Sequence, residues 1–194
     1  MEVLSENFYA RDTVSVANDL LGKVLVHESP QGTTSGIIVE TEAYLENDPA
    51  CHAYRGMTKR NATMFGPPGK AYVYLIYGIH YCFNAVTREE GKGEAVLVRS
   101  LCPLEGIELM RERRGGKCRE TRLSCGPGNL CKSMGINAGH DKISLEDSPL
   151  HVLSDNINVA LEDIGVSKRV GLNKGDNIFL RFYLKGYEKF VSGR

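Results

Sequence analysis

Residues 71–86 of the chain read AYVYLIYGIHYCFNAV, and this stretch decides the fold class that we predict. Aromatic and β-branched residues fill both of its ends, a composition typical of β-strands. Gly78 lies between the two ends and permits a tight turn. We therefore expect two antiparallel strands that form a hairpin, with its tip between Tyr77 and His80.

The remaining segments contain more strand patterns than helix patterns. Apolar and β-branched residues lie between turn residues and predict further strands at residues 23–27, 35–43, 94–101, 151–153 and 177–184. Helices are expected at residues 14–21 after an Asp12 cap, from Pro103 through Met110, and at residues 129–134. Because strands outnumber helices and hairpins recur, we predict an α+β fold. It would be a single mixed domain, residues 1–194, around a mainly antiparallel β-sheet with a protruding β-hairpin.

The composition is that of an ordinary globular chain. Of its 194 residues, 42% are hydrophobic and 25% are charged, which excludes collagen, coiled coil and full-length disorder. No apolar run approaches the roughly 20 residues that span a bilayer, and no apolar signal segment fits in the first twenty residues. Six cysteines without a Cys-x-x-Cys pair favour reduced thiols and make zinc improbable. We expect the protein in the cytoplasm or associated with the nucleoid.

Positive and negative charges balance but are segregated along the chain. Lys plus Arg and Asp plus Glu each number 24, so the whole surface cannot attract nucleic acid. Residues 111–122 nevertheless hold six basic side chains, which are Arg111, Arg113, Arg114, Lys117, Arg119 and Arg122. Solvated surface is one interpretation of this basic stretch, and a phosphate-binding face is the other.

Two acidic residues and a tyrosine end the strand expected at residues 35–43. Glu40, Glu42 and Tyr44 alternate, so they share one face of a strand. The acids could face solvent at a frayed strand end. Alternatively, a carboxylate could lie at the rim of a pocket and act as a general base.

Aromatic and histidine side chains gather in residues 44–83, and Tyr72 and Tyr74 alternate onto one face of the first hairpin strand. Such rings could fill an ordinary core. They could equally line a flat pocket that stacks a planar ligand such as a nucleobase. The whole set is Tyr44, His52, Tyr54, Tyr72, Tyr74, Tyr77, His80, Tyr81 and Phe83.

A long polar loop, residues 45–70, separates the acidic residues from the hairpin. Loops of this length in compact domains are commonly functional, and this one carries Arg55, Lys59, Arg60 and Asn61. Arg99 follows three apolar residues of an expected strand, so its charge needs a partner if it points inward. Glu42 could supply that partner, although a purely structural ion pair would leave the same sequence.

These features together permit cleavage of an N-glycosidic bond. A carboxylate can activate water and stabilise an oxocarbenium-like sugar. The base must first leave the DNA stack for a ring-lined pocket, and a side chain at a hairpin tip can fill the gap behind it.

Several motifs in one order resemble a known family. They are VETEAY at residues 39–44, His52, RN at 60–61 with MF at 64–65, YVYLIYG at 72–78, Asn84, Arg99 with PLEG at 103–106, and GPGNLC at 126–131. Each motif alone is weak. Their order and spacing, over residues 8–183, resemble those of the alkyladenine (3-methyladenine, methylpurine) DNA glycosylase family.

The resemblance implies a monofunctional enzyme that hydrolyses the N-glycosidic bond of alkylated or deaminated purines after base flipping. Glu42 looks like the general base that activates water, and Arg99 looks like its partner in positioning that water. The implied enzyme needs no metal or other cofactor and has no lyase step. Its implied partner is double-stranded DNA containing damaged purines, and we expect a monomer that does not bind membranes.

The resemblance also implies how the base is held. Tyr44, His52 and Tyr74 look like the walls around the flipped base. Tyr77 looks like the residue that intercalates where the base was. Asn84 looks like the pocket residue that disfavours normal guanine through its exocyclic amino group.

Two other functions stay open at this point. A nucleic-acid-binding module without catalysis, such as a formyltransferase-type accessory domain, needs no carboxylate beside a pocket. A small-molecule N-ribosyl hydrolase needs neither a wedge at Tyr77 nor a basic face. The sequence does not rank 3-methyladenine, 7-methylguanine, hypoxanthine and ethenoadenine as substrates.

Overall fold

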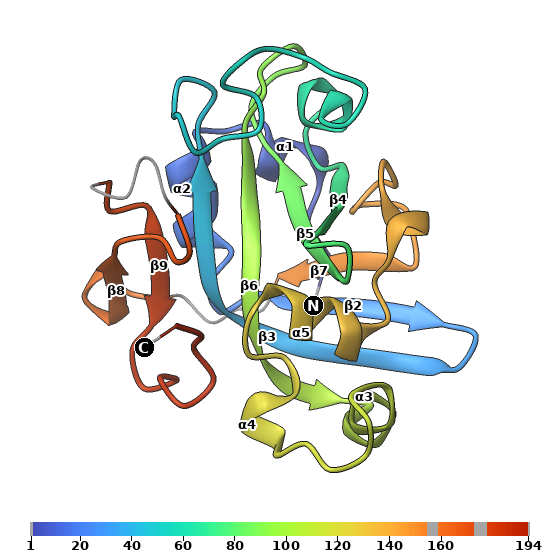
Figure 1. Cartoon of the computed structure of the whole chain (residues 1–194). Helices are drawn as coiled ribbons and strands as arrows, with labels where there is room; N and C mark the ends of the chain where they lie inside the picture. The colour runs from blue at the N-terminus through green and yellow to red at the C-terminus, as the bar shows by residue number, and fades with distance from the viewer. Residues whose placement is uncertain (1, 155–158, 173–177, 194) are drawn as a thin grey trace.

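One sheet connects the nine strands of the computed structural model, which describes residues 2–154, 159–172 and 178–193. Seven strands lie in the order β1-β7-β2-β3-β6-β5-β4, and β9 pairs with both β3 and β8 (Figure 1). Every pairing is antiparallel, so the predicted α+β fold with a mainly antiparallel sheet is confirmed. The strands are β1 (Glu2–Val3), β2 (Val24–Ser29), β3 (Gly32–Tyr44), β4 (Ala71–Ile76), β5 (His80–Val86), β6 (Ala95–Glu105), β7 (Leu150–Ser154), β8 (Ile164–Ser167) and β9 (Arg181–Leu184).

The α-helices of the described residues are short. The Asp12 carboxylate accepts the backbone N–H of Ser15 at 2.9 Å and so caps α2, as predicted. The helix expected at residues 129–134 is α5, which begins at Pro127 and ends before Gly135, whose φ is 75°. The helices are α1 (Glu6–Tyr9), α2 (Thr13–Asp19), α3 (Ile107–Arg113), α4 (Glu120–Leu123) and α5 (Pro127–Met134), and the 3-10 turns are η1 (Ala62–Phe65), η2 (Ala138–His140) and η3 (Leu161–Asp163).

Two predicted boundaries are wrong. The helix expected from Pro103 does not start there, because β6 continues to Glu105 and Pro103 pairs with Gly36 of β3. This pairing lies at a register shift, where a proline without an N–H is tolerated. The helix α3 begins only after Gly106, whose φ is 69°. The strand expected at residues 177–184 begins at Arg181, and residue 177 lies outside the described residues.

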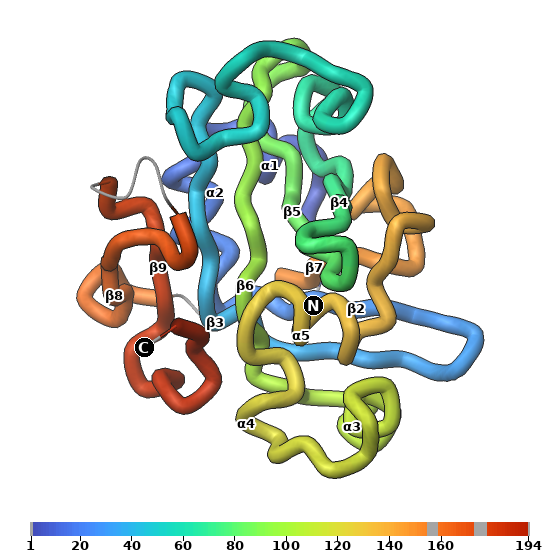
Figure 2. Tube along the Cα trace, viewed as in Figure 1, coloured from blue at the N-terminus to red at the C-terminus, as the bar shows by residue number. Residues whose placement is uncertain are grey.

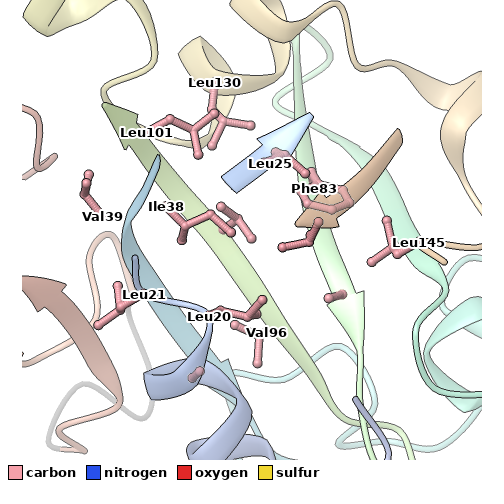
Figure 3. Packing of buried hydrophobic residues seen from close by; sticks show 14 of the residues in the cluster. Leu20, Leu21, Leu25, Ile38, Val39, Phe83, Val96, Leu101, Leu130 and Leu145 are labelled. Atoms are coloured by element: carbon pink, nitrogen blue, oxygen red, sulfur yellow. The ribbon is translucent and has the colours of Figure 1, made fainter. Parts of the chain in front are cut away.

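The main core joins the sheet to its helices. Helix α2 packs on β3 and β6, and α5 packs on β5 and β6. Figure 3 shows Leu20 and Leu21 next to α2, Leu130 on α5, and Ile38 and Leu101 on the strands between them. All five side chains are at most 1% exposed, and each contributes about 1.5–3 kcal/mol by its burial. The core therefore fixes β3, β5 and β6, the strands that carry most of the predicted site.

Strand β3 carries Glu42 of the predicted site and the nearby acid Glu40, and it has neighbouring strands on both sides where they lie. Its residues 32–37 pair with β2, whereas Glu40 and Glu42 pair with β9. On the other side β6 pairs with β3 up to Tyr44, with register shifts on both sides of Glu40. Glu40 and Glu42 are both 0% exposed. The alternative of a strand end that frays into solvent is therefore wrong.

Strands β4 and β5 form the predicted hairpin, which ends in the three-residue loop 77–79. Tyr77 and Gly78 have φ values of 54° and 73°, a conformation that costs energy for a residue with a side chain. The tyrosine side chain points outward and is 81% exposed. The hairpin and its tip are confirmed, whereas protrusion of the hairpin stays a prediction.

The long loop between β3 and β4 covers one end of the sheet and contains a single 3-10 turn, η1. It forms the teal loops at the top of Figure 2. Asn61, 3% exposed, organises it by donating its side-chain amide to the carbonyl groups of His52 and Gly56. The loop is thus held by its own side chains, and it brings His52 to the hairpin.

Candidate active site

A cavity of about 400 Å³ opens between the hairpin, the long loop, the start of α5 and residues 170–172. Six of the seven predicted site residues line it: Tyr44, His52, Tyr74, Tyr77, Asn84 and Arg99. The seventh, Glu42, lies directly behind the wall, in contact with Tyr44 and Arg99. The structure therefore brings all seven residues together, although they lie on four strands, a loop and a turn.

Glu42 accepts three hydrogen bonds from residues that the structure describes. Its Oε2 accepts the Tyr44 hydroxyl at 2.9 Å and the Arg99 Nη1 at 3.2 Å, while its Oε1 accepts the backbone N–H of Val170 at 2.8 Å. A carboxylate has about four acceptor positions. The described residues leave one position for a further donor, and it lies on Oε1. Val170, which donates to this oxygen, also lines the cavity.

Tyr44 forms the part of the cavity wall next to Glu42. Burial raises the pKa of its hydroxyl, and the negative charge of Glu42 raises it further. The hydroxyl therefore stays protonated and donates to the carboxylate. On the ring, the guanidinium of Arg169 lies 4.7 Å from the centroid, within the range of a cation–π contact.

Three further rings stand close together at the hairpin. The rings of Tyr72 and Tyr74 lie 5.2 Å apart, and that of His52 lies 4.6 Å from Tyr74. The Nδ1 of His52 lies 2.9 Å from the Tyr72 hydroxyl. Burial lowers the pKa of His52, and the nearby charge of Arg60 lowers it further, which favours a neutral imidazole. This part of the wall is thus aromatic, and its polar groups are the imidazole nitrogens of His52 and the tyrosine hydroxyls.

Asn84 and Cys82 lie side by side on the same face of β5 and complete the cavity below the rings. Asn84 is 4% exposed and donates its side-chain amide to the carbonyl of Tyr72 at 3.0 Å, which fixes its orientation. Cys82 pairs with Tyr74 across the hairpin. Burial raises the pKa of its thiol, against a hydrogen bond with Tyr74 that lowers it.

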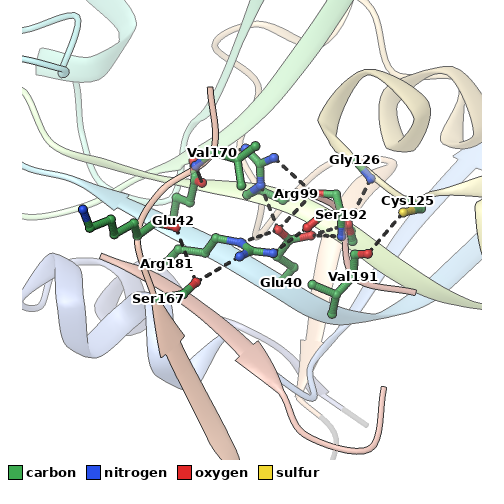
Figure 4. A network of polar contacts seen from close by, with 12 residues as sticks. Glu40, Glu42, Arg99, Cys125, Gly126, Ser167, Val170, Arg181, Val191 and Ser192 are labelled. Carbon is green, nitrogen blue, oxygen red and sulfur yellow. Dashed lines mark hydrogen bonds and ion pairs between the residues drawn. The ribbon is translucent and has the colours of Figure 1, made fainter. Parts of the chain in front are cut away.

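Arg99 has the acidic partner that its sequence context predicted, and a second one as well. Its Nη1 donates to Glu42, and its Nε donates to Glu40 at 3.0 Å (Figure 4). Its Nη2 donates to the hydroxyl of Ser192 at 3.0 Å. Glu40 also accepts Arg181, so two arginines and two glutamates form one buried group.

Sequence reasoning missed the residues that reach this group from the end of the chain. Val170, Arg181 and Ser192 lie more than 125 positions from the glutamates that they contact. It also missed the buried ion pair between Arg169 and Asp48. A buried arginine needs an acidic partner, but nothing in the sequence indicated that Arg169 and Arg181 are buried.

The two basic segments of the sequence differ in their surroundings. In the long loop, the guanidinium of Arg60 lies over the Tyr74 ring, 5.9 Å from its centroid. In residues 111–122, Arg111 pairs with Glu108, and Arg113 donates to Ser29. These two arginines therefore hold local structure, and a phosphate-binding role of the stretch stays a prediction.

The glycine-rich start of α5 forms part of the cavity wall. Gly128 lies against His80 of the hairpin, where an added Cβ would come within 2.9 Å of the imidazole ring. The backbone N–H of Gly126 donates to Ser100 at 3.0 Å. The glycines thus permit a close approach of α5 to β5.

Known proteins resemble this chain over nearly its whole length. The model of a family described as methylpurine-DNA glycosylase (MPG) matches residues 7–188. A protein of Methanoculleus marisnigri named "Putative 3-methyladenine DNA glycosylase" is 53% identical over 96% of this chain and 97% of its own. A protein of the same name from Carboxydothermus hydrogenoformans is 50% identical over 98% of both chains. The chain belongs to the methylpurine-DNA glycosylase family. The resemblance read from the motifs is therefore confirmed.

Membership of the methylpurine-DNA glycosylase family implies a DNA substrate and hydrolysis of an N-glycosidic bond. The family match contains all seven predicted site residues and ends before Ser192. No three His, Cys, Asp or Glu side chains in the described parts of the chain are placed to hold a metal ion. Among the same residues, no helix has the length and apolar character needed to cross a membrane.

Proposed function

We propose that this protein is a monofunctional DNA glycosylase that removes alkylated or deaminated purines of the 3-methyladenine, 7-methylguanine and hypoxanthine class from double-stranded DNA. The observation that carries the proposal is the ring-lined cavity of about 400 Å³ whose wall contains Tyr44 and Arg99, both hydrogen-bonded to the buried Glu42. A purine fits such a space by stacking.

In the proposed reaction, the damaged nucleotide flips out of the duplex and its base enters the cavity. The rings of Tyr44, His52 and Tyr74 stack against the base and hold it. Asn84, whose amide is fixed by its hydrogen bond to the Tyr72 carbonyl, disfavours binding of normal guanine through the exocyclic amino group of that base. The exposed side chain of Tyr77 fills the gap in the duplex, because it lies at the hairpin tip beside the cavity.

The chemical step needs water at the sugar carbon that bears the base. A water held on the remaining acceptor position of Glu42, and oriented by Arg99, attacks C1′ as the bond to the base breaks. The proton of the water passes to Glu42, and the electron pair of the broken bond leaves with the base. A base that is already cationic departs as a neutral molecule, whereas a neutral base such as hypoxanthine needs protonation.

The test uses duplexes that each carry one defined lesion, scored for abasic sites under single-turnover conditions. We expect Glu42→Gln to lower base release at least about 100-fold, as general-base loss does, while affinity for the damaged duplex stays within a few fold. The matched control is Glu94→Gln, because Glu94 contacts Thr13 and lies away from the cavity. Base release by Glu42→Gln equal to that of the control would refute the proposed catalysis.

The same assay separates the other functions. Specific binding of damaged duplexes by the wild type without any base release would indicate a non-catalytic binding module. Release from free nucleosides but not from duplex DNA would indicate an N-ribosyl hydrolase. Strand cleavage at the abasic site without heat or alkali would contradict the absence of a lyase step. Sedimentation of the free protein tests the expected monomer.

A further inference from the structure

We infer that Glu40 and Ser192 are positioning residues that orient Arg99 toward Glu42. The inference rests on the proposed function, since it concerns the arginine assigned there to the attacking water. It adds two residues that act through Arg99 and do not touch the substrate, and one of them lies outside the residues matched by the family.

The guanidinium of Arg99 is held at each of its three nitrogens. Nε donates to Glu40 at 3.0 Å, Nη2 donates to Ser192 at 3.0 Å, and Nη1 donates to Glu42 at 3.2 Å (Figure 4). A guanidinium is planar, so two fixed nitrogens determine the direction of the third. Glu40 and Ser192 therefore aim Nη1 at Glu42 and at the adjacent cavity.

Glu40 in turn is fixed on every side. Its Oε1 accepts Arg99, Arg181 at 2.7 Å and the Ser192 hydroxyl at 2.9 Å, and its Oε2 accepts the Ser100 hydroxyl at 2.6 Å. Its Oε2 also accepts the backbone N–H of Ser192 at 2.8 Å. With five donors and no exposed surface, this carboxylate cannot rotate without breaking several bonds.

The opposite charges of this group balance inside the protein. Two arginines face two glutamates, so the buried cluster has no net formal charge. Burial alone would raise the pKa of Glu40, but Arg99, Ser100, Ser192 and Arg181 together lower it. A buried charge that is paired and fully hydrogen-bonded holds a unique geometry, which a positioning group requires.

Ser192 places the end of the described chain in this cluster. It is 7% exposed and lies next to Val191, whose carbonyl accepts the thiol of Cys125 beside the start of α5. Val191 and Ser192 thus pack between Arg99 and the start of α5. Movement of this segment would release Nη2 and leave the guanidinium held by carboxylates alone.

The kinetic test is Ser192→Ala, assayed by single-turnover base release from a hypoxanthine duplex. Loss of one hydrogen bond to a charged group should slow release about tenfold, while the Kd for a duplex with an uncleavable abasic analogue stays within about twofold. The matched control is Ser133→Ala, which removes another buried serine hydroxyl away from Arg99 and should keep the wild-type rate. Glu40→Gln should slow release at least as much as Ser192→Ala.

A double variant separates positioning from general support of the fold. Arg99→Lys keeps the charge but cannot form the three-way fork, so Ser192→Ala added to it should slow release no further. A repeated tenfold loss in the double variant would show that Ser192 acts independently of Arg99 and would overturn the inference. So would a wild-type rate for Ser192→Ala when Glu42→Gln is impaired. If Glu42→Gln releases the base normally, the proposed function itself fails.

A measurement on the wild type does not depend on the folding of any variant. A guanidinium held at all three nitrogens should show separate, slowly exchanging NMR signals for its Nη protons. We expect separate signals for Arg99 in the DNA-free protein. Averaged Nη signals for Arg99 would contradict the proposed positioning of its guanidinium by Glu40 and Ser192.

Discussion

The ion pair between Arg169 and Asp48 provides the sharpest test of how the cavity wall is held. Their side chains are 0% and 2% exposed, and the pair joins the long loop to the segment before Val170. Arg169 also donates to the carbonyl of Ala43 at 3.0 Å and covers the ring of Tyr44. Replacement by methionine keeps much of the volume and leaves Asp48 as a buried charge without its arginine.

Breaking a buried pair on one side costs about 3–5 kcal/mol. For a chain of this length, each kcal/mol lowers the Tm by about 2–4 °C. Multiplying the two ranges, we expect Arg169→Met to lower the Tm by about 6–20 °C. Urea unfolding at pH 7, followed by far-UV circular dichroism, would give the free energy directly.

The matched second variant is Arg169→Met with Asp48→Asn. Asparagine keeps the oxygen that accepts the backbone N–H of Ala50 at 2.9 Å but carries no charge. We expect it to recover more than half of the lost free energy, since the uncompensated charge is the main cost. A loss below about 1 kcal/mol in the single variant, or no recovery in the double variant, would refute this account of the wall.

Three further changes test other parts of the molecule. Tyr44→Phe removes one of the three donors to Glu42 and should cost about 1.5–3 kcal/mol in urea unfolding; an unchanged midpoint would mean that this hydrogen bond contributes nothing. Tyr77→Ala should leave the unfolding free energy within about 0.5 kcal/mol, because the ring is exposed, but should weaken binding of damaged duplexes in a fluorescence titration; equal affinity would remove the proposed wedge. Burial, opposed by a hydrogen bond with the Met134 carbonyl, lowers the pKa of His27 in the folded protein, and His140 lowers it further. The unfolded chain then binds a proton that the folded chain does not, so stability should fall as the pH drops below about 6.5. Unfolding midpoints between pH 5 and 8 should show this slope, and His27→Gln should make it less steep.

Local composition was sufficient to predict the hairpin, α2 and the turn after α5. Each of these depends on residues close in sequence, such as Asp12 with Ser15, or Tyr77 with Gly78. The start of α3 was mispredicted because pairing with β3 extends β6 past Pro103, and a strand partner some sixty-seven positions away leaves no local signal.

In the candidate site, too, local features were predicted and distant contacts were not. The need of Arg99 for an acidic partner followed from its apolar neighbours, and the structure supplies Glu42 as expected. The larger role of Glu40 as a partner was not predicted, since two of its other partners, Arg181 and Ser192, lie 141 and 152 positions away. Such contacts arise from the pairing of β9 with β3 and from the packing of the chain end.

Cys82 has a consequence for a protein whose substrates arise from alkylating chemistry. Its side chain lines the cavity that we propose for the purine, and burial raises the pKa of its thiol. Electrophiles react with the thiolate form of cysteine far faster than with the thiol. A methylating reagent that reaches the proposed base site therefore meets a poor nucleophile, and the site resists the kind of chemistry that produces methylated purines.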